Sequence, residues 1–225
     1  MVYIPKAAAV LLLRASFVLF IPVGCNTSTI HRVSADKNEK LIFDGKSFKG
    51  WEGDTVSVWR IRDGAIEAGS LTEITPHNHF LVTTGSYGDF VLKLKFKLTG
   101  SEGFINAGVQ FHSQRLTDPP YEMTGYQADL GPGYWASLYD ESRRNKTLAQ
   151  PDSAIVSELL KPGKWNDLEI RSKDRHILIF LNGRQTVDYT EADISLPQSG
   201  LIGLQIHGAG KTLVSYKDIT IKEEN

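Results

Sequence analysis

Apolar and polar residues alternate along much of the chain from Leu41 onward. The segment Phe90–Leu98 shows this most clearly, with apolar residues at even positions and Lys93, Lys95 and Lys97 between them. A period of two places successive side chains on opposite faces of a β-strand, so these lysines are expected on an outer, convex face. Similar runs recur at intervals of about ten residues. The strands expected are Val56–Arg62, Ala65–Ala68, His79–Thr83, Phe90–Leu98, Ala107–Ser113, Gly125–Leu130, Trp135–Tyr139, Asn166–Ser172, His176–Leu181, Gly200–His207 and Thr212–Lys222.

Turn signals separate several of these runs. Asp63-Gly64 and Asn182-Gly183 are dipeptides typical of tight hairpin turns, and Ile177–Gln185 predicts a hairpin. Helical periodicity is confined to Pro151–Leu160, where a turn or two of helix is expected. Short strands at regular spacing predict an all-β fold, a sandwich or jelly roll of two antiparallel sheets.

The N-terminal segment differs in kind from the rest of the chain. Residues 1–25 contain the apolar run Ala15–Gly24, which is too short for a membrane span and follows Arg14. This pattern is typical of a secretory signal. Cys25, the single cysteine, follows the run directly and resembles the lipidated cysteine of a bacterial lipoprotein signal, although Pro22 stands where a leucine is usual. An ordinary cleaved signal with an incidental Cys25 is the alternative.

These patterns predict three parts in the 225 residues: a signal or lipoprotein leader (1–25), a polar tether (26–39) and one jelly-roll domain (40–225). We therefore expect an exported bacterial lipoprotein, periplasmic or attached to the outer membrane. Its only membrane contact would be a lipid on Cys25.

Composition and charge exclude several partners. Lys and Arg total 25 against 26 Asp and Glu, so the net charge is -1 and no basic stripe indicates nucleic-acid binding. The His77-x-His79 pair lacks the cysteine and carboxylate partners typical of a zinc site. Asp44 and Asp218 belong to no calcium-binding loop pattern, so a structural calcium ion has no support. We expect no metal and no cofactor.

Three other strands alternate with an unusual polar set. Solvated strand faces usually collect lysine, glutamate, threonine and serine, whereas these strands carry glutamine, histidine and aspartate. The residues expected on one outer face are Gln110 and His112, Gln127 and Asp129, and Gln205 and His207. Amides and carboxylates provide fixed donors and acceptors that can orient a polyhydroxylated ligand. The pattern therefore predicts a carbohydrate ligand; the alternative is that each pair is only an exposed half-strand.

The segment Gly131–Lys146 lies next to the second of these strands and is rich in aromatic, acidic and arginine residues. Aromatic rings suit the C–H faces of sugars, and arginine offers planar donors. The ligand-binding candidates here are Tyr134, Trp135, Tyr139, Asp140, Glu141, Arg143 and Arg144. Because the two arginines are adjacent, at most one is expected to reach the ligand. Alternatively, the acids and arginines pair with one another and hold a surface loop in place.

The order of several blocks resembles the 3-keto-disaccharide hydrolase family over about Leu41–Ile221. The blocks are LIFDGKSFKG with Trp51, YGDFVLKLKFKL, NAGVQFHS, GYQADLG, KWNDLEI, FLNGR and GLIGLQIHG. The resemblance implies a concanavalin-like jelly roll, an exported and often lipid-anchored protein, and cleavage of glycosides oxidised at C3. The stretch YWASLYDESRRNK resembles one subgroup of the family.

A ketone at C3 acidifies the C2 proton, so the glycosidic bond can leave by elimination and water can add afterwards. This reaction needs a base, a donor for the enolate oxygen and an acid for the leaving group. The catalytic candidates are His112, His207, Asp129 and Glu141, and Arg143 or Arg144 is the expected cationic donor. Ordinary glycoside hydrolysis with Asp129 and Glu141 as the carboxyl pair is one alternative. A non-catalytic carbohydrate-binding module and a structural surface lipoprotein are the others.

Overall fold

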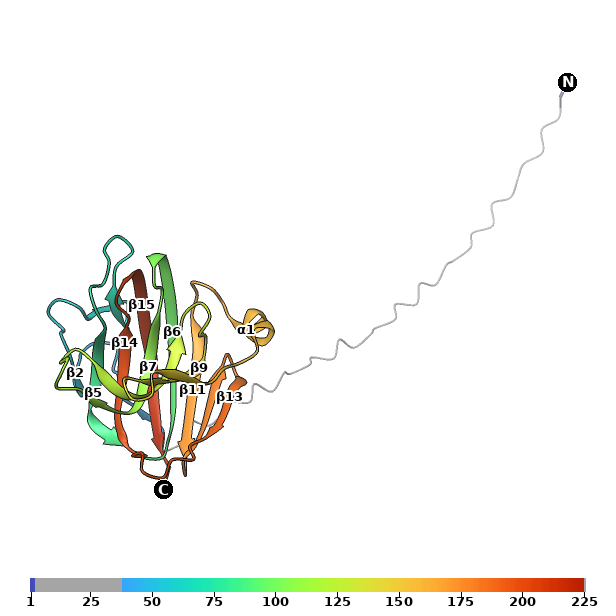
Figure 1. The fold of residues 1–225 in the computed structure, drawn as a ribbon. Coiled ribbons are helices and arrows are strands. Elements are labelled where there is room, and N and C mark those ends of the chain that lie inside the picture. Colours follow the sequence, from blue (N-terminus) through green and yellow to red (C-terminus); the bar gives the residue numbers. More distant parts are fainter. Residues whose placement is uncertain (3–37, 225) are drawn as a thin grey trace. The chain divides into compact units, whose positions relative to one another are not determined.

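Two antiparallel β-sheets packed face to face make up the fold (Figure 1). The structure is a computed structural model that describes residues 1–2 and 38–224. The expected lipidation site Cys25 lies outside the described residues, as do nearly all of the expected leader and tether. The predicted jelly-roll sandwich of two antiparallel sheets is confirmed.

The first sheet has eight strands in the order β13-β12-β11-β6-β15-β4-β3, with β1 paired to β15. Its strands are β1 (Lys40–Leu41), β3 (Arg60–Arg62), β4 (Ala65–Gly69), β6 (Phe90–Gly103), β11 (Asn166–Lys173), β12 (His176–Leu181), β13 (Arg184–Thr190) and β15 (Gly210–Glu223). Lys93 lies on its outer surface with 48% of its side chain exposed, as the alternation in β6 predicts.

The second sheet has seven strands in the order β10-β9-β8-β7-β14-β5-β2. Its strands are β2 (Trp51–Glu52), β5 (His79–Tyr87), β7 (Ala107–Arg115), β8 (Met123–Leu130), β9 (Ser137–Glu141), β10 (Lys146–Ala149) and β14 (Gly200–Ile206). The strands β7, β8 and β14, which carry the unusual polar residues, are neighbours at the centre of this sheet.

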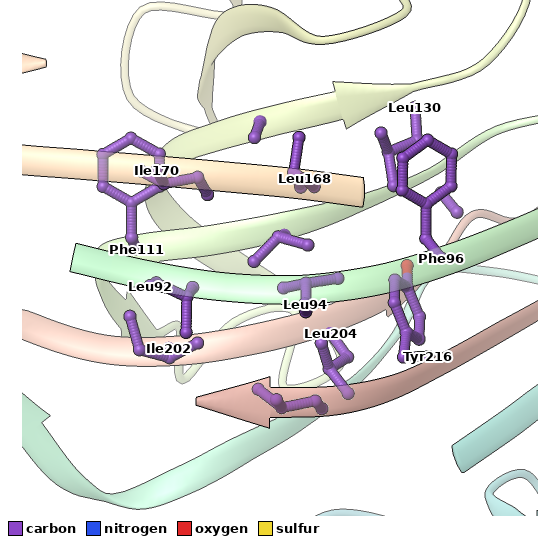
Figure 2. Packing of buried hydrophobic residues seen from close by; sticks show 14 of the residues in the cluster. Leu92, Leu94, Phe96, Phe111, Leu130, Leu168, Ile170, Ile202, Leu204 and Tyr216 are labelled. Atoms are coloured by element: carbon purple, nitrogen blue, oxygen red, sulfur yellow. The ribbon is translucent and has the colours of Figure 1, made fainter. Parts of the chain in front are cut away.

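Apolar side chains from the inner faces of both sheets fill the space between them (Figure 2). Leu92 and Leu94 of β6 lie in the same buried cluster as Phe111 of β7 and Leu204 of β14. Tyr216 of β15 crosses this core, and its hydroxyl donates to backbone carbonyls of the second sheet, at Gly108 (3.0 Å) and Gln205 (2.8 Å). The core therefore holds the strands under the polar face in a fixed position.

Most predicted elements are present, with differences at their ends. The predicted helix is α1 (Ser153–Leu159), capped by the Asp152 carboxylate, which accepts the Ala154 N–H at 2.7 Å. The residues Asn182 and Gly183 both have positive φ, as a tight hairpin turn requires. None of the helices in the described part of the chain is long and apolar enough to cross a membrane.

The predicted strand Val56–Arg62 is a strand only in its last part, β3. The first part of Val56–Arg62 is a turn, because the Asp54 carboxylate accepts the N–H groups of Val56 (3.1 Å) and Ser57 (2.8 Å). Local side-chain bonding of this kind competes with strand pairing. The edge strand β10 was not expected, because its four residues show no alternation.

Candidate functional site

The register of the strands determines which side chains lie side by side on the outer face of the second sheet. Gln205, Gly108, Asp129 and Ser137 lie in one row across β14, β7, β8 and β9. Residues directly opposite one another on neighbouring strands share a face of the sheet. In the next row Gln110 lies opposite Gln127, and Gln127 lies opposite Tyr139. We call this surface, carrying Gln110, Gln127, Asp129 and Gln205, the polar face.

A pocket of about 110 Å³ opens on the polar face. It is lined by Phe104, Asn106, Gln127, Asp129, Tyr134, Tyr139, Glu141 and His207. Larger depressions lie elsewhere, including one of about 390 Å³ on the first sheet. That depression is lined by surface residues such as Lys93, Glu169 and Arg171, of which Arg171 pairs with Glu169. The smaller pocket gathers three ionisable groups whose pKa values burial shifts, Asp129, Glu141 and His207.

Asp129 lies on the floor of this pocket with 5% of its surface exposed. Its Oδ1 accepts the Asn106 amide N–H at 2.8 Å and the backbone N–H of Leu130 at 2.9 Å. Burial raises the pKa of Asp129 to about 6, although hydrogen bonds from Asn106, Leu130 and Gln127 favour the charged form. The carboxyl group is thus fixed in position and titrates near neutral pH.

Glu141 stands at the end of β9 and contributes a second carboxyl group to the pocket. Burial, together with the charges of Glu122 and Asp129, raises the pKa of Glu141 to about 7, while a hydrogen bond from the Gln205 amide opposes the rise. A carboxyl with this pKa is protonated in about half of the molecules at pH 7.

His207 reaches the pocket from the end of β14 as a neutral imidazole. Its Nδ1 lies 2.8 Å from the Gly208 carbonyl oxygen, which can only accept, so Nδ1 carries the proton and Nε2 is an acceptor. Burial lowers the pKa of His207, with the Gly208 hydrogen bond opposing the shift. The ring also meets Phe104 edge-on, with 4.6 Å between centroids.

A chain of hydrogen bonds supports the floor of the pocket. The Ser113 hydroxyl donates to Gln110 Oε1 at 2.6 Å, and Gln110 Nε2 donates to Gln127 Oε1 at 3.0 Å. Gln127 folds over Gly108, where a Cβ would lie 2.3 Å from its Cδ. Gln110 is wholly buried, so it positions Gln127 and does not line the pocket.

His112 does not lie on the polar face, contrary to the prediction. A bulge in β7 between Phe111 and Gln114 breaks the alternation, and His112 has a positive φ of 45°. Its ring is turned into the core against Phe90, and its Nε2 lies 2.9 Å from the Gly88 carbonyl oxygen. The sequence has no glycine or proline here to reveal the bulge.

Arg143 and Arg144 do not line the pocket either. Both pair with the wholly buried Asp140 on the opposite face of β9 from Glu141, and Arg144 also binds Glu191 at 2.6 Å. Arg143 lies over the ring of Tyr126 at 4.5 Å. The sequence also allowed these arginines to pair with the acidic residues of the same segment. Asp140 does pair with both arginines, but the pairs form a largely buried network and do not hold a surface loop in place.

Trp135 does not line the pocket. Its ring stacks on Phe96, with 6.2 Å between centroids, and lines a separate depression of about 320 Å³ beside α1. The first residues of the predicted strand Trp135–Tyr139 form a turn, since β9 begins only at Ser137. The alternation assumed for this stretch therefore does not apply to Trp135.

Sequence reasoning missed Phe104 and Asn106, which line the pocket, and Glu122, whose charge acts on Glu141. All three lie outside the regular part of the strands, where no periodicity marks them. Among the described residues, no three histidine, cysteine, aspartate or glutamate side chains are grouped to hold a metal ion. The Asp44 carboxylate instead accepts the N–H groups of Lys46 and Ser47 in its own turn.

The fold and the pocket define a jelly-roll sandwich of the kind found in carbohydrate-active proteins, with an ionisable site on one sheet face. The sequence matches a family model described as 3-keto-alpha-glucoside-1,2-lyase-like domain over residues 38–222. The chain therefore belongs to this family, and the family resemblance seen in the sequence is confirmed. The subgroup suggested by YWASLYDESRRNK stays a prediction. No curated protein sequence matches the chain.

Solved structures share the fold. A proposed glycosyl hydrolase from Parabacteroides distasonis is 22% identical, with a TM-score of 0.61 over 84% of this chain and 94% of that one. The carbohydrate-binding module CBM66 from Bacillus subtilis is 14% identical, with a TM-score of 0.60 over 77% of this chain and 96% of the module. A protein with a galectin-like fold from Bacillus subtilis is 10% identical, with a TM-score of 0.61 over 82% of this chain and 94% of that one.

Proposed function

We propose that this domain cleaves glycosides carrying a ketone at C3, by elimination across C1 and C2 followed by addition of water. Family membership supports the substrate class. The observation that carries the proposal is the pair Asp129 and Glu141, two carboxyl groups in one pocket with pKa values of about 6 and about 7. Such a pair provides one group that is mainly ionised and one that still holds a proton.

The proposed first step is a balanced elimination. Asp129, mainly ionised at neutral pH, takes the C2 proton, which the C3 ketone acidifies. The electron pair forms an enolate whose negative charge rests on O3, and then the C1–C2 double bond as the bond from C1 to the glycosidic oxygen breaks. Glu141 gives its proton to that oxygen, so the leaving unit departs as a neutral alcohol.

The enolate oxygen needs a donor other than arginine, because Arg143 and Arg144 are engaged elsewhere. Tyr139 lines the pocket, and burial together with the charge of Glu141 raises the pKa of its hydroxyl. The hydroxyl therefore keeps its proton at neutral pH and can donate to O3. His207 Nε2 is an acceptor that can orient the water added in the second step.

Two substitutions test this assignment. Asp129→Asn and Glu141→Gln are expected to lower kcat by about 10²-fold or more, because each removes a proton-transfer group, while KM changes far less. Asp188→Asn, an exposed position paired with His176, is the matched control and is expected to keep full activity. Saturable sugar binding by the wild-type protein without any product would favour a non-catalytic carbohydrate-binding module instead.

We also propose that the protein is exported and lipidated at Cys25. The support is the sequence of residues 1–25, with its short apolar run directly before the single cysteine. In a bacterial host, the wild-type protein is expected to incorporate labelled fatty acid and to fractionate with membranes. Cys25→Ser should abolish the label; retention of the label by this variant, or a wild-type protein without label, would contradict the proposal.

A further inference from the structure

Asn106 stands directly before β7 and binds two of the ionisable residues of the pocket. Its side chain lines the pocket although the residue is only 2% exposed, and Nδ2 donates to Asp129 Oδ1 at 2.8 Å. Its backbone carbonyl oxygen accepts the N–H of His207 at 3.2 Å. One residue therefore connects Asp129, near the end of β8, with His207, just beyond the end of β14.

The amide of Asn106 favours one protonation state of its partner. An ionised carboxylate can only accept hydrogen bonds, and the Asn106 NH2 group offers it a donor. A hydrogen bond to the charged form favours that form, whereas burial opposes it. The Asn106 amide therefore helps to keep Asp129, which is 5% exposed, ready to accept a proton.

The hydrogen bonds on Asp129 also distinguish its two oxygens. Oδ1 accepts from Asn106 Nδ2 at 2.8 Å and from the Leu130 backbone N–H at 2.9 Å. A carboxylate offers about four acceptor positions, two on each oxygen, so these two donors occupy Oδ1. The Gln127 amide, which also favours the charged form, still leaves a lone pair on Oδ2. Oδ2 is therefore the oxygen suited to accept the C2 proton.

Gly131, which follows Leu130, leaves the space in which the Asn106 amide lies. A Cβ at this position would stand 2.9 Å from Asn106 Nδ2 and 2.6 Å from the Ile105 carbonyl oxygen. Gly131 is not among the glycines with positive φ, so the close approach requires a glycine here and the backbone conformation does not. The packing of the segments 105–106 and 130–131 thus places the amide against Asp129.

We propose that Asn106 is a positioning residue for the elimination: its amide holds Oδ1 of Asp129 so that Oδ2 takes the C2 proton, and its carbonyl anchors the backbone of His207. Asn106 itself neither gives nor takes a proton. The inference rests on the proposed function, but the hydrogen bond on which it depends is testable without a substrate. Without the amide, less would oppose the effect of burial, and Asp129 would hold its proton more tightly.

The test measures the pKa of Asp129 from the 13C NMR signal of its carboxyl carbon. Asn106→Leu keeps the branched shape of the side chain but removes the donor. We expect a pKa of about 6 in the wild-type protein and a value higher by about one unit or more in the variant. The rising limb of kcat/KM against pH should move to higher pH by the same amount. An unchanged pKa, with or without a lower melting temperature, would show that Asn106 is only structural and would overturn the proposal.

Gly131→Ala reaches the same hydrogen bond from the other side. The added methyl group displaces the Asn106 amide, so the pKa of Asp129 should rise although Asn106 is still present. The matched control is Gly85→Ala, at an exposed position where a Cβ would lie no closer than 3.8 Å to the Tyr87 hydroxyl, and it should leave the pKa unchanged. Equal pKa values in Gly131→Ala and the control would contradict the proposal. If the pKa rises as expected but the wild-type protein converts no 3-keto-glycoside, the proposed function fails, and the role in elimination fails with it, while the hydrogen bond stands.

Discussion

Asp129 and Glu141 hold their protons more tightly than free carboxyl groups do, chiefly because both are buried in the pocket. Their surroundings separate their roles. Asp129 accepts hydrogen bonds from Asn106 and Leu130, which favour its charged form, while Glu141 faces the charges of Glu122 and Asp129, which favour its protonated form. Asp129, which loses its proton at the lower pH, is suited to act as the base, and Glu141 is suited to act as the acid.

The dependence of kcat/KM on pH should therefore be a narrow bell-shaped curve. A base must be deprotonated, so kcat/KM rises with pH through the pKa of about 6 of Asp129. An acid must be protonated, so kcat/KM falls as pH rises through the pKa of about 7 of Glu141. Measuring kcat/KM from pH 4 to 9 with a 3-keto-glycoside should show a maximum between about 6 and 7. A rate that keeps rising above pH 8 would contradict the acid role of Glu141.

Several pocket residues could be predicted from alternation alone. Gln127 and Asp129 follow the period of two in β8, and His207 continues that of β14 one residue beyond its end; the structure brings all three to one pocket. Asn106 and Glu122 could not be found in this way, because they precede strands and their positions depend on how the loops fold back.

At the scale of elements, the last two residues of β9 point to opposite faces of the sheet and have different roles. Glu141 faces the pocket, whereas the preceding Asp140 points inward and pairs with Arg143 and Arg144. Arg144 also binds Glu191, which accepts the Tyr126 hydroxyl at 2.7 Å. This buried network fixes the end of β9 and therefore the position of Glu141.

Removing Arg144 should destabilise the protein strongly. Arg144→Ala takes the cation from Glu191 and one of two arginines from Asp140, both almost wholly buried, and breaking such a buried pair costs about 3–5 kcal/mol. Chemical denaturation measures this loss. The control is Arg184→Ala, whose exposed pair with Glu158 should contribute about 0–1 kcal/mol. A loss of unfolding free energy for Arg144→Ala as small as that for Arg184→Ala would show that the network is not needed for stability.

The side-chain alternation predicted for β7 is correct only in the first part of the strand. Its alternation holds from Ala107 to Phe111 and then fails at the bulge, which turns His112 into the core. A register shift of this kind depends on pairing with β8, the next strand, and with β14, which is distant in sequence, so the alternation within β7 alone could not predict it.

For the whole molecule, the interior between the two sheets supplies the stability that positions the polar face. Leu92→Ala removes a wholly buried side chain and should lower the free energy of unfolding by about 2–5 kcal/mol. Lys95→Ala, on the outer side of the same strand, removes only an exposed pair with Asp167 and should cost about 0–1 kcal/mol. Denaturant titration of both variants checks the inward and outward assignment of β6, and equal effects would contradict it.

The fold class could be predicted because alternation, turn dipeptides and strand spacing all depend on local sequence. The strands around Leu92 and Leu204 follow the period of two, and the turn at Asn182 and Gly183 has the expected positive φ. The packing partners could not be predicted, because they join distant segments. The contact of Glu122 with Asn78, 44 residues apart, is an example that only the folded chain reveals.

The central claim is elimination from a 3-keto-glycoside, and the fate of the C2 hydrogen tests it most directly. The substrate is a 3-keto-glucoside labelled with deuterium at C2, and the wild-type protein is compared with Asp129→Asn at early times. The account predicts release of the leaving alcohol, loss of the label to water at the same rate, and little of either with the variant. No alcohol released, or alcohol released with the label retained at C2, would contradict it.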